Sequence, residues 1–306
     1  MPLAVGPAIS QMRAMLFAVT LVNAASDAAD RVAAAVASLG AAVKERDDLG
    51  PLAVDLVVEA QERAALAAAV DAALAGLPVD FAVQPVEGRR KRLLIADMDS
   101  TIIGCECLDE LADFAGVKDL VSEITERAMR GELAFEGALR ERVAMLKGLS
   151  VDALQQCYDE RVRLNPGART LVRTMAAHGA RCALVSGGFG YFTSRVAQAA
   201  GFHLDRANTL IAVDGHLTGE VGEPILGKAA KLAALNEETA ALGLTPADAL
   251  AVGDGANDLA MIAAAGLGVA YRAKPVVAAQ ADARVDHADL TALLYFQGYR
   301  VTEFSA

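Results

Sequence analysis

The first 85 residues carry six short patterned segments. Four are short runs typical of strands, and two place Ala, Val and Leu at helical spacing. The expected elements are a strand at 14–22, a helix at 27–39, strands at 43–46 and 53–60, a helix at 61–75 and a strand at 79–83. This βαββαβ order predicts an α+β domain over residues 1–85, made of one sheet and two helices.

The apolar run at 14–22 has a second interpretation. Arg13 precedes it and Asn23-Ala24-Ala25 follows it, which together fit a signal peptide with a small-residue cleavage site. Cleavage there would delete the first strand of the predicted sheet. We therefore favour the strand.

Residues 86–92 are polar and basic, and they predict a solvated linker between two domains. Beyond them, apolar runs alternate with helical patterns, and Asp214-Gly215 predicts a hairpin turn. Strands are expected at 93–96, 181–185, 209–213, 216–220, 249–252, 267–270 and 283–285, and helices at 227–242 and from about 257. Residues 108–164 carry helical patterns only. The second domain, 93–306, is therefore predicted to be α/β, a doubly wound parallel sheet with a small helical cap at about 105–164.

Composition narrows the class of partners. The 306 residues are 54% hydrophobic and 22% charged, and their formal net charge is -11. Such a chain can bury a large core, but its charge disfavours nucleic acid and anionic membrane surfaces. No apolar stretch is long enough to predict a transmembrane helix. The four cysteines form no C-x-x-C pair and are typical of reduced thiols, so we expect a cytoplasmic protein.

The carboxyl end of the first core strand carries two acids. Asp97 and Asp99 follow the strand directly and are separated by one residue. Ligands of open α/β sheets bind at such strand ends. One carboxylate can act as a nucleophile while the other moves protons. A helix-capping loop is the alternative if this motif is taken alone.

Three later segments supply groups that complement these acids. Ser186 and Gly187 follow the second buried strand and could bind an anion through a hydroxyl and backbone N–H groups at a helix start. Asp254, with Asn257 and Asp258 beside it, follows the third and offers the oxygen ligands that Mg²⁺ prefers. A helical cation comes between them, and spacing alone leaves Lys228 and Lys231 as competitors.

In this order, the four segments resemble the four motifs of the haloacid dehalogenase superfamily of phosphatases. The match covers residues from about 93 to the C-terminus, and it is similar in detail to the bacterial phosphoserine phosphatases of serine synthesis. The resemblance implies that Asp97 is the nucleophile and a magnesium ligand. It implies that Asp99 is the general acid/base and provides a second ligand through its carbonyl, and that Asp254 is the third ligand.

The same resemblance assigns the groups around the phosphoryl oxygens. It selects Lys231 over Lys228, and it places Ser186 and Gly187 beside Lys231 as the residues that hold these oxygens. Asn257 matches a residue beside the substrate. Asp258 matches a residue that supports Lys231 or metal-bound water.

The cap residues narrow the expected substrate. By resemblance, Glu106 faces the substrate ammonium, Arg142 faces its carboxylate, and Met129 and Phe135 are apolar residues above the site. A guanidinium can bind a carboxylate through two parallel hydrogen bonds, so the pairing is chemically sensible. The expected reaction is hydrolysis of phosphoserine to serine and phosphate through an aspartyl-phosphate, as the last step of serine biosynthesis.

Several alternatives remain at this stage. Another small amino-acid phosphate could be the substrate, or a second alcohol could accept the phosphoryl group. A dehalogenase would not need Asp99, and a P-type pump would need membrane helices. The domain at 1–85 resembles an ACT-type domain in its element order alone. It could therefore sense an amino acid, or form a homodimer, or be purely structural.

Overall fold

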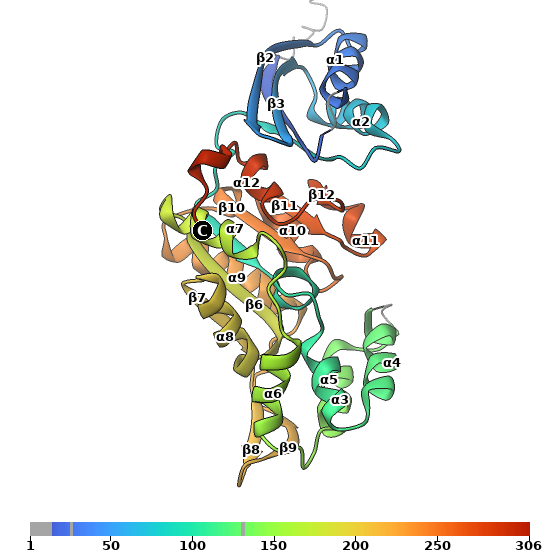
Figure 1. Ribbon diagram of the computed structural model, residues 1–306, viewed down its shortest axis with the longest axis vertical. Coiled ribbons are helices and arrows are strands. Elements are labelled where there is room, and N and C mark those ends of the chain that lie inside the picture. The colour runs from blue at the N-terminus through green and yellow to red at the C-terminus, as the bar shows by residue number, and fades with distance from the viewer. Residues whose placement is uncertain (1–13, 25–26, 130–131) are drawn as a thin grey trace, which may run out of the picture.

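The computed structural model describes residues 14–24, 27–129 and 132–306. They form three parts that follow one another down the long axis of the molecule in Figure 1. An N-terminal unit lies at one end, a parallel sheet flanked by helices occupies the middle, and a group of helices and a hairpin lie at the other end. None of the described helices is long and apolar enough to cross a membrane.

The N-terminal unit is a four-stranded antiparallel sheet in the order β2-β3-β1-β4, with two helices on one face. Its elements are β1 (Met15–Val22), α1 (Ala28–Ser38), β2 (Ala42–Gly50), β3 (Ala53–Ala60), α2 (Arg63–Leu74) and β4 (Asp80–Pro85). The predicted βαββαβ order is thus confirmed, and the run at 14–22 forms a central strand paired on both sides. The predicted strand at 43–46 was too short. As an edge strand β2 buries only Leu49, so its charged residues hide the strand pattern.

The other face of this sheet packs against the rest of the chain. Thr20, Asp55, Asp80 and Gln84 are buried there. The Asp80 carboxylate accepts hydrogen bonds from the backbone N–H groups of residues 286–288. A dimer through the N-terminal unit would therefore have to use its helices or an edge of its sheet.

The linker is solvated in part: five of its seven residues are exposed, whereas Arg89 is half-buried and Lys91 is buried. Arg89 forms a 2.6 Å ion pair with the buried Asp55, and Arg90 stacks over the ring of Tyr299. Lys91 is buried and donates to the carbonyl of Ala247. Basic side chains at a domain boundary suggest solvent exposure, but here their partners come from distant parts of the chain, which a local pattern cannot reveal.

The middle of the molecule is a six-stranded parallel sheet in the order β12-β11-β10-β5-β6-β7, with helices on both faces. Its strands are β5 (Leu93–Ala96), β6 (Arg181–Phe189), β7 (Leu204–Asn208), β10 (Ala249–Gly253), β11 (Leu267–Tyr271) and β12 (Ala283–Val285). The accompanying helices and helical turns are a π-turn at Met98–Ile102, α7 (Ala168–Ala177), α8 (Gly190–Ala200), α9 (Lys228–Ala241), a 3₁₀ turn at Pro246–Asp248, α10 (Leu259–Ala264), α11 (Pro275–Ala278), α12 (Ala292–Phe296) and a 3₁₀ turn at Val301–Glu303. The predicted doubly wound α/β core is confirmed, although strand β7 was missed. Its polar, half-buried sequence carries no strand signal.

The cap follows β5 and the π-turn. It consists of α3 (Cys107–Phe114), α4 (Lys118–Met129), α5 (Phe135–Ala144) and α6 (Asp152–Arg161). The hairpin of β8 (Leu210–Val213) and β9 (His216–Val221) lies against it at the same end of the molecule. Gly148 and Leu217 join the two through a 2.8 Å backbone hydrogen bond. The expectation of helices alone between 108 and 164 is confirmed, except for isolated bridges.

Candidate active site

Asp97 lies at the carboxyl end of β5. Its backbone N–H donates to the carbonyl of Val252 at 3.0 Å, so the residue is fixed between two central strands. Its Oδ1 accepts a hydrogen bond from the Met98 N–H at 2.8 Å. Ser100 has a φ of +54°, a conformation that turns the chain sharply behind the two acids. The local fold therefore places Asp97 and Asp99 after the same strand, and both line one cavity.

Asp99 is positioned by two hydrogen bonds. Its Oδ1 accepts from the N–H of Cys107 at 2.9 Å, and its Oδ2 accepts from the hydroxyl of Ser186 at 3.2 Å. Burial raises the pKa of Asp99 to about 6, with the negative charge of Asp97 adding to the effect against the opposing hydrogen bond from Cys107. A carboxyl with such a pKa can both hold and release a proton near neutral pH.

Lys231 is the buried cation of the site. Its Nζ lies 2.6 Å from Oδ2 of Asp97 and 2.6 Å from Oδ1 of Asp258. Burial by itself lowers the pKa of Lys231, but the two carboxylates outweigh it and the pKa is raised. Lys228, one turn earlier, is exposed and lines the mouth of the pocket. The structure thus brings Lys231, and not Lys228, into contact with Asp97.

Three buried acids form a cluster that suits a divalent cation. Carboxylate oxygens of Asp97, Asp254 and Asp258 lie within 4.8 Å of one another. Burial, with repulsion from Asp97 as the second cause, raises the pKa of Asp254 to about 7. Crowded acidic oxygens that hold protons so strongly would be relieved by a hard cation, which prefers such ligands. Asp99 turns its carboxylate away from this cluster, toward Ser186 and Cys107.

The segment at Ser186 precedes a helix rather than beginning one, so the helix starts later than predicted. Strand β6 continues through Phe189, and α8 begins only at Gly190. The Ser186 hydroxyl instead accepts from the N–H of Gly188 at 2.8 Å and donates to Asp99. The glycine is required by space, because a Cβ on Gly188 would lie 2.9 Å from Oδ2 of Asp99.

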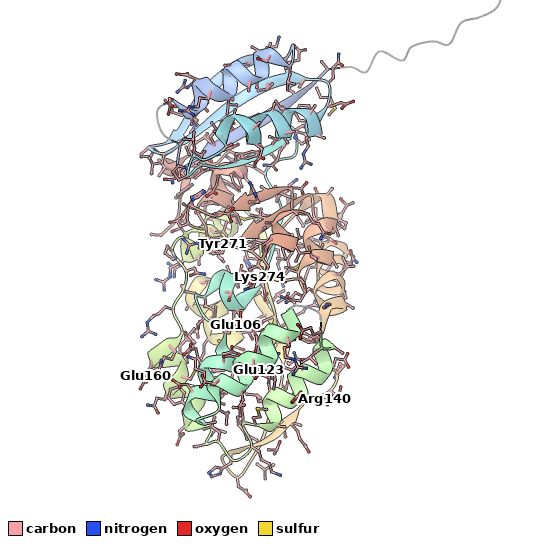
Figure 2. All side chains as sticks on the ribbon, turned by 90° about the vertical axis from the view of Figure 1, so that its right-hand side faces the viewer. Glu106, Glu123, Arg140, Glu160, Tyr271 and Lys274 are labelled. Atoms are coloured by element: carbon pink, nitrogen blue, oxygen red, sulfur yellow. The ribbon has the colours of Figure 1, made fainter. Side chains whose placement is uncertain are left out.

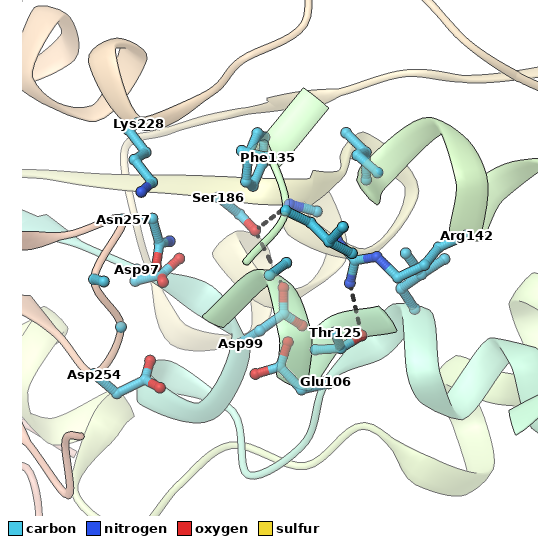
Figure 3. Close-up of a pocket in the computed structure, with 18 of the residues that line it drawn as sticks. Asp97, Asp99, Glu106, Thr125, Phe135, Arg142, Ser186, Lys228, Asp254 and Asn257 are labelled. Atoms are coloured by element: carbon cyan, nitrogen blue, oxygen red, sulfur yellow. Dashed lines mark hydrogen bonds between the residues drawn. The ribbon is translucent and has the colours of Figure 1, made fainter. Parts of the chain in front are cut away.

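The cap and the core enclose one cavity of about 290 Å³. Glu106, Phe135 and Arg142 line it from the cap segment, and Figure 3 shows Glu106 just below Asp99, with Arg142 farther from Asp97 and Asp254. Figure 2 shows Glu106 between the central sheet and the cap helices. A Cβ on Gly187 would lie 3.0 Å from the ring of Phe135, so the cap and the core meet closely at this point.

The remaining predicted residues divide into two groups. Asn257 and Gly187 line the same cavity, and Asp258 lies beneath it in contact with Lys231. The side chain of Met129 lies outside the described residues. Sequence reasoning missed Thr125 and Leu133, which also line the cavity. Thr125 lies on the inner face of an amphipathic helix, and that face is the only signal that could have pointed to it.

The two charged cap residues do not pair with each other. Glu106 accepts a 2.6 Å hydrogen bond from the hydroxyl of Ser100. Arg142 donates through Nη1 to Thr125 at 2.9 Å and through Nε to the carbonyl of Ala138 at 3.2 Å. Burial, followed by repulsion from Asp99, raises the pKa of Glu106 to about 8. The cavity therefore offers an acidic group and a cation at separate positions.

Comparison with known proteins defines the class first. Residues 94–263 match the family described as haloacid dehalogenase-like hydrolase. A phosphoserine phosphatase from a Polaromonas species is 46% identical over 224 residues, which cover 72% of this chain and 95% of that protein. The chain belongs to the phosphoserine phosphatase family of these hydrolases.

Two further relatives extend the comparison. A phosphoserine phosphatase from Archaeoglobus fulgidus is 44% identical over 219 residues, covering 71% of this chain and 63% of that protein. The chain thus spans less than two thirds of the length of this relative. A structure described as a phospho-aspartyl intermediate analogue of phosphoserine phosphatase superposes with a TM-score of 0.64 at 37% identity, covering 67% of this chain and 98% of the other.

Proposed function

We propose that this protein hydrolyses O-phospho-L-serine to L-serine and phosphate, the last step of serine biosynthesis, through an aspartyl-phosphate on Asp97. The observation that carries the proposal is one cavity lined by Asp97 and Asp99 from the core and by Glu106 and Arg142 from the cap segment. A phosphate ester that also bears an ammonium and a carboxylate matches all of these groups. The four cysteines are free, which fits our placement of the reaction in the cytoplasm.

The chain's own residues suffice to define the first chemical step. The Asp97 carboxylate attacks phosphorus in line, and the bond from phosphorus to the serine oxygen breaks. Asp99 in its protonated form donates to the departing oxygen, which a pKa of about 6 permits over part of the population near neutral pH. Ser186, the N–H groups after it and the Lys231 ammonium stabilise charge on the phosphoryl oxygens.

Hydrolysis of the aspartyl-phosphate reverses the role of Asp99. Its carboxylate takes a proton from water, the water oxygen attacks phosphorus, and the bond to Asp97 breaks. Glu106 and Arg142 hold the ammonium and carboxylate of the substrate, with Phe135 covering them and Asn257 beside the phosphate. This binding energy orients the ester for attack.

Mg²⁺ is the cation that we propose for the site, held by carboxylates of Asp97 and Asp254 and the backbone carbonyl of Asp99, with Asp258 in support. When bound it supplies positive charge that offsets repulsion between a carboxylate and a phosphate dianion. The buried acid cluster, with the raised pKa of Asp254, supports this assignment.

The test compares kcat/KM for phosphoserine, phosphothreonine and other small phosphate esters. We expect phosphoserine to be preferred, and we expect Asp97→Asn to abolish turnover while the circular dichroism spectrum stays unchanged. Addition of a second alcohol should yield no new phosphate ester. A chain that hydrolyses these esters equally well would contradict the substrate assignment, and an active Asp97→Asn protein, with deamidation excluded by mass spectrometry, would contradict the nucleophile.

A further inference from the structure

An acid, Glu106, and a cation, Arg142, line the same small space on the cap side of the cavity. Burial lowers the pKa of Arg142, and the nearby acids oppose this effect, Asp109 most strongly and then Glu106 and Asp99. Arginine and glutamate side chains are long enough to reach each other across such a cavity. A direct Glu106–Arg142 ion pair would neutralise both groups, and neither would be available to a zwitterionic substrate.

The described residues show no such pair, because each group is held by a hydroxyl instead. Ser100 donates to Glu106 at 2.6 Å, and Thr125 accepts from Nη1 of Arg142 at 2.9 Å. Figure 3 shows the dashed line between Arg142 and Thr125, with Glu106 placed separately below Asp99. Within the described part of the chain, the guanidinium is hydrogen-bonded to a carbonyl and a hydroxyl and to no carboxylate.

The surroundings of Thr125 fix what its hydroxyl can do. A hydroxyl has one proton to donate. Two acceptors lie within reach of that proton, Oδ1 of Asp109 at 2.9 Å and the carbonyl of Val121 at 3.0 Å. Asp109 is itself held through its other oxygen by the Ser122 hydroxyl at 3.0 Å. The side of Thr125 that faces Arg142 is therefore a lone pair, which accepts from the guanidinium and has no proton left for a substrate.

We propose that Thr125 is a positioning residue that tethers Arg142 away from Glu106, so that the cavity keeps separate sites for a carboxylate and an ammonium. The tether acts on Nη1 and the Ala138 carbonyl on Nε, so among the described residues Nη2 remains available to a carboxylate. Ser100 plays the matching part for Glu106. This inference rests on the proposed function, because it concerns the amino-acid half of the substrate.

Thr125→Val removes the hydroxyl with little change of shape, and Thr125→Ser retains it. We expect Thr125→Val to reduce kcat/KM for phosphoserine roughly 10- to 100-fold, mostly through KM, since misplacement of a binding group by about 1 Å can have an effect of this size. Hydrolysis of ethyl phosphate, which has neither charged group, should be unchanged. Thr125→Ser should restore most of the phosphoserine activity.

Thr239→Val is the matched control. Thr239 is also a buried helical threonine, and it donates to the carbonyl four residues earlier, but it lies outside the cavity. It should leave the ratio of the two activities unchanged, so any general effect of losing such a hydroxyl is accounted for. Thermal unfolding of each variant, followed by circular dichroism, identifies a protein that has not folded. In that case the ratio is measured on Thr125→Ala, which has the same expected outcome.

The possible outcomes separate the two proposals. If the unaltered protein does not prefer phosphoserine over ethyl phosphate, the proposed function fails before any variant is considered. If it does prefer phosphoserine and folded Thr125→Val keeps the full preference, the tether is refuted and the proposed function stands. Equal loss on both substrates would also refute the tether, because Thr125 would then act on the chemistry or on the fold.

Discussion

Replacement of Lys231 tests how the buried charges of the active site are balanced. Its ammonium lies 2.6 Å from each of two buried carboxylates, those of Asp97 and Asp258, and its side chain is almost wholly buried. Lys231→Met keeps a similar volume and removes the charge. The two carboxylates are then left in a buried site without a cation, and the loss of one partner of a buried ion pair typically costs about 3–5 kcal/mol of folding free energy.

This loss is large enough to measure by urea denaturation. With a slope of roughly 3 kcal/mol per molar urea for a chain of this size, the midpoint should fall by about 1–1.7 M. Far-UV circular dichroism is the suitable signal, because the chain has no tryptophan. The measurement is made at pH 8 without divalent metal, so that no other cation compensates.

The difference in urea midpoint between Lys231→Met and the unaltered protein should also depend on pH. Burial raises the pKa of Asp258, so in the folded state this carboxyl takes up a proton as the pH falls. At pH 5 less negative charge would be left without a partner, and the midpoint difference between the two proteins should shrink. Lys228→Met, an exposed change one turn earlier, should leave the midpoint where it is. An equal midpoint for Lys231→Met and the unaltered protein at pH 8 would refute the reasoning.

Three further predictions concern other parts of the molecule. Gly188→Ala should lose most phosphatase activity while its thermal midpoint changes little, because the added Cβ meets Oδ2 of Asp99 at 2.9 Å; kcat close to that of the unaltered protein would contradict this. The thermal stability of the metal-free protein should fall as the pH rises from 5 to 8, because the folded-state pKa values of Asp99, Asp254 and Glu106 are raised to about 6, 7 and 8. Added Mg²⁺ should reduce this pH dependence. A thermal midpoint that rises with pH would contradict the prediction. Asp80→Ala should destabilise the protein by about 2–4 kcal/mol, because buried backbone N–H groups lose their acceptor, and a stability equal to that of the unaltered protein in urea would show that water replaces it.

The sequence was sufficient to predict the elements that carry a strong local pattern. The wholly apolar strand at residues 93–96 and the βαββαβ order of the first 85 residues were predicted correctly. Strand β7 and most of β2 were not predicted, because both lie at the edge of a sheet. Polar residues that are not fully buried replace the alternation of apolar and polar positions there. The ion pair between Arg89 and Asp55 was not predicted for another reason: it joins residues 34 positions apart in the sequence.

In the active site, too, the sequence predicted the residues that follow a strong local pattern and missed those that depend on packing. Asp97, Asp99 and Asp254 were recognisable because a buried strand precedes each motif and parallel strands bring their ends together. The choice between Lys228 and Lys231 could not be made from spacing, because both lie in the first turns of one helix and only the packing of α9 decides which one reaches Asp97. Thr125 was not predicted, because a threonine on an amphipathic helix has no distinguishing pattern until its hydrogen-bond partners are known.

One face of the N-terminal sheet packs against the rest of the chain, and this contact limits how the residues on its two sides can vary among relatives. The Polaromonas relative aligns over 95% of its own length but with only 72% of this chain, so the phosphatase part occurs there without a segment of this size. Where no such unit is present, the amides of residues 286–288, which bind Asp80 here, need another acceptor or water. We therefore expect residues such as Asp80, Gln84 and those at 286–288 to vary together among relatives that share this unit.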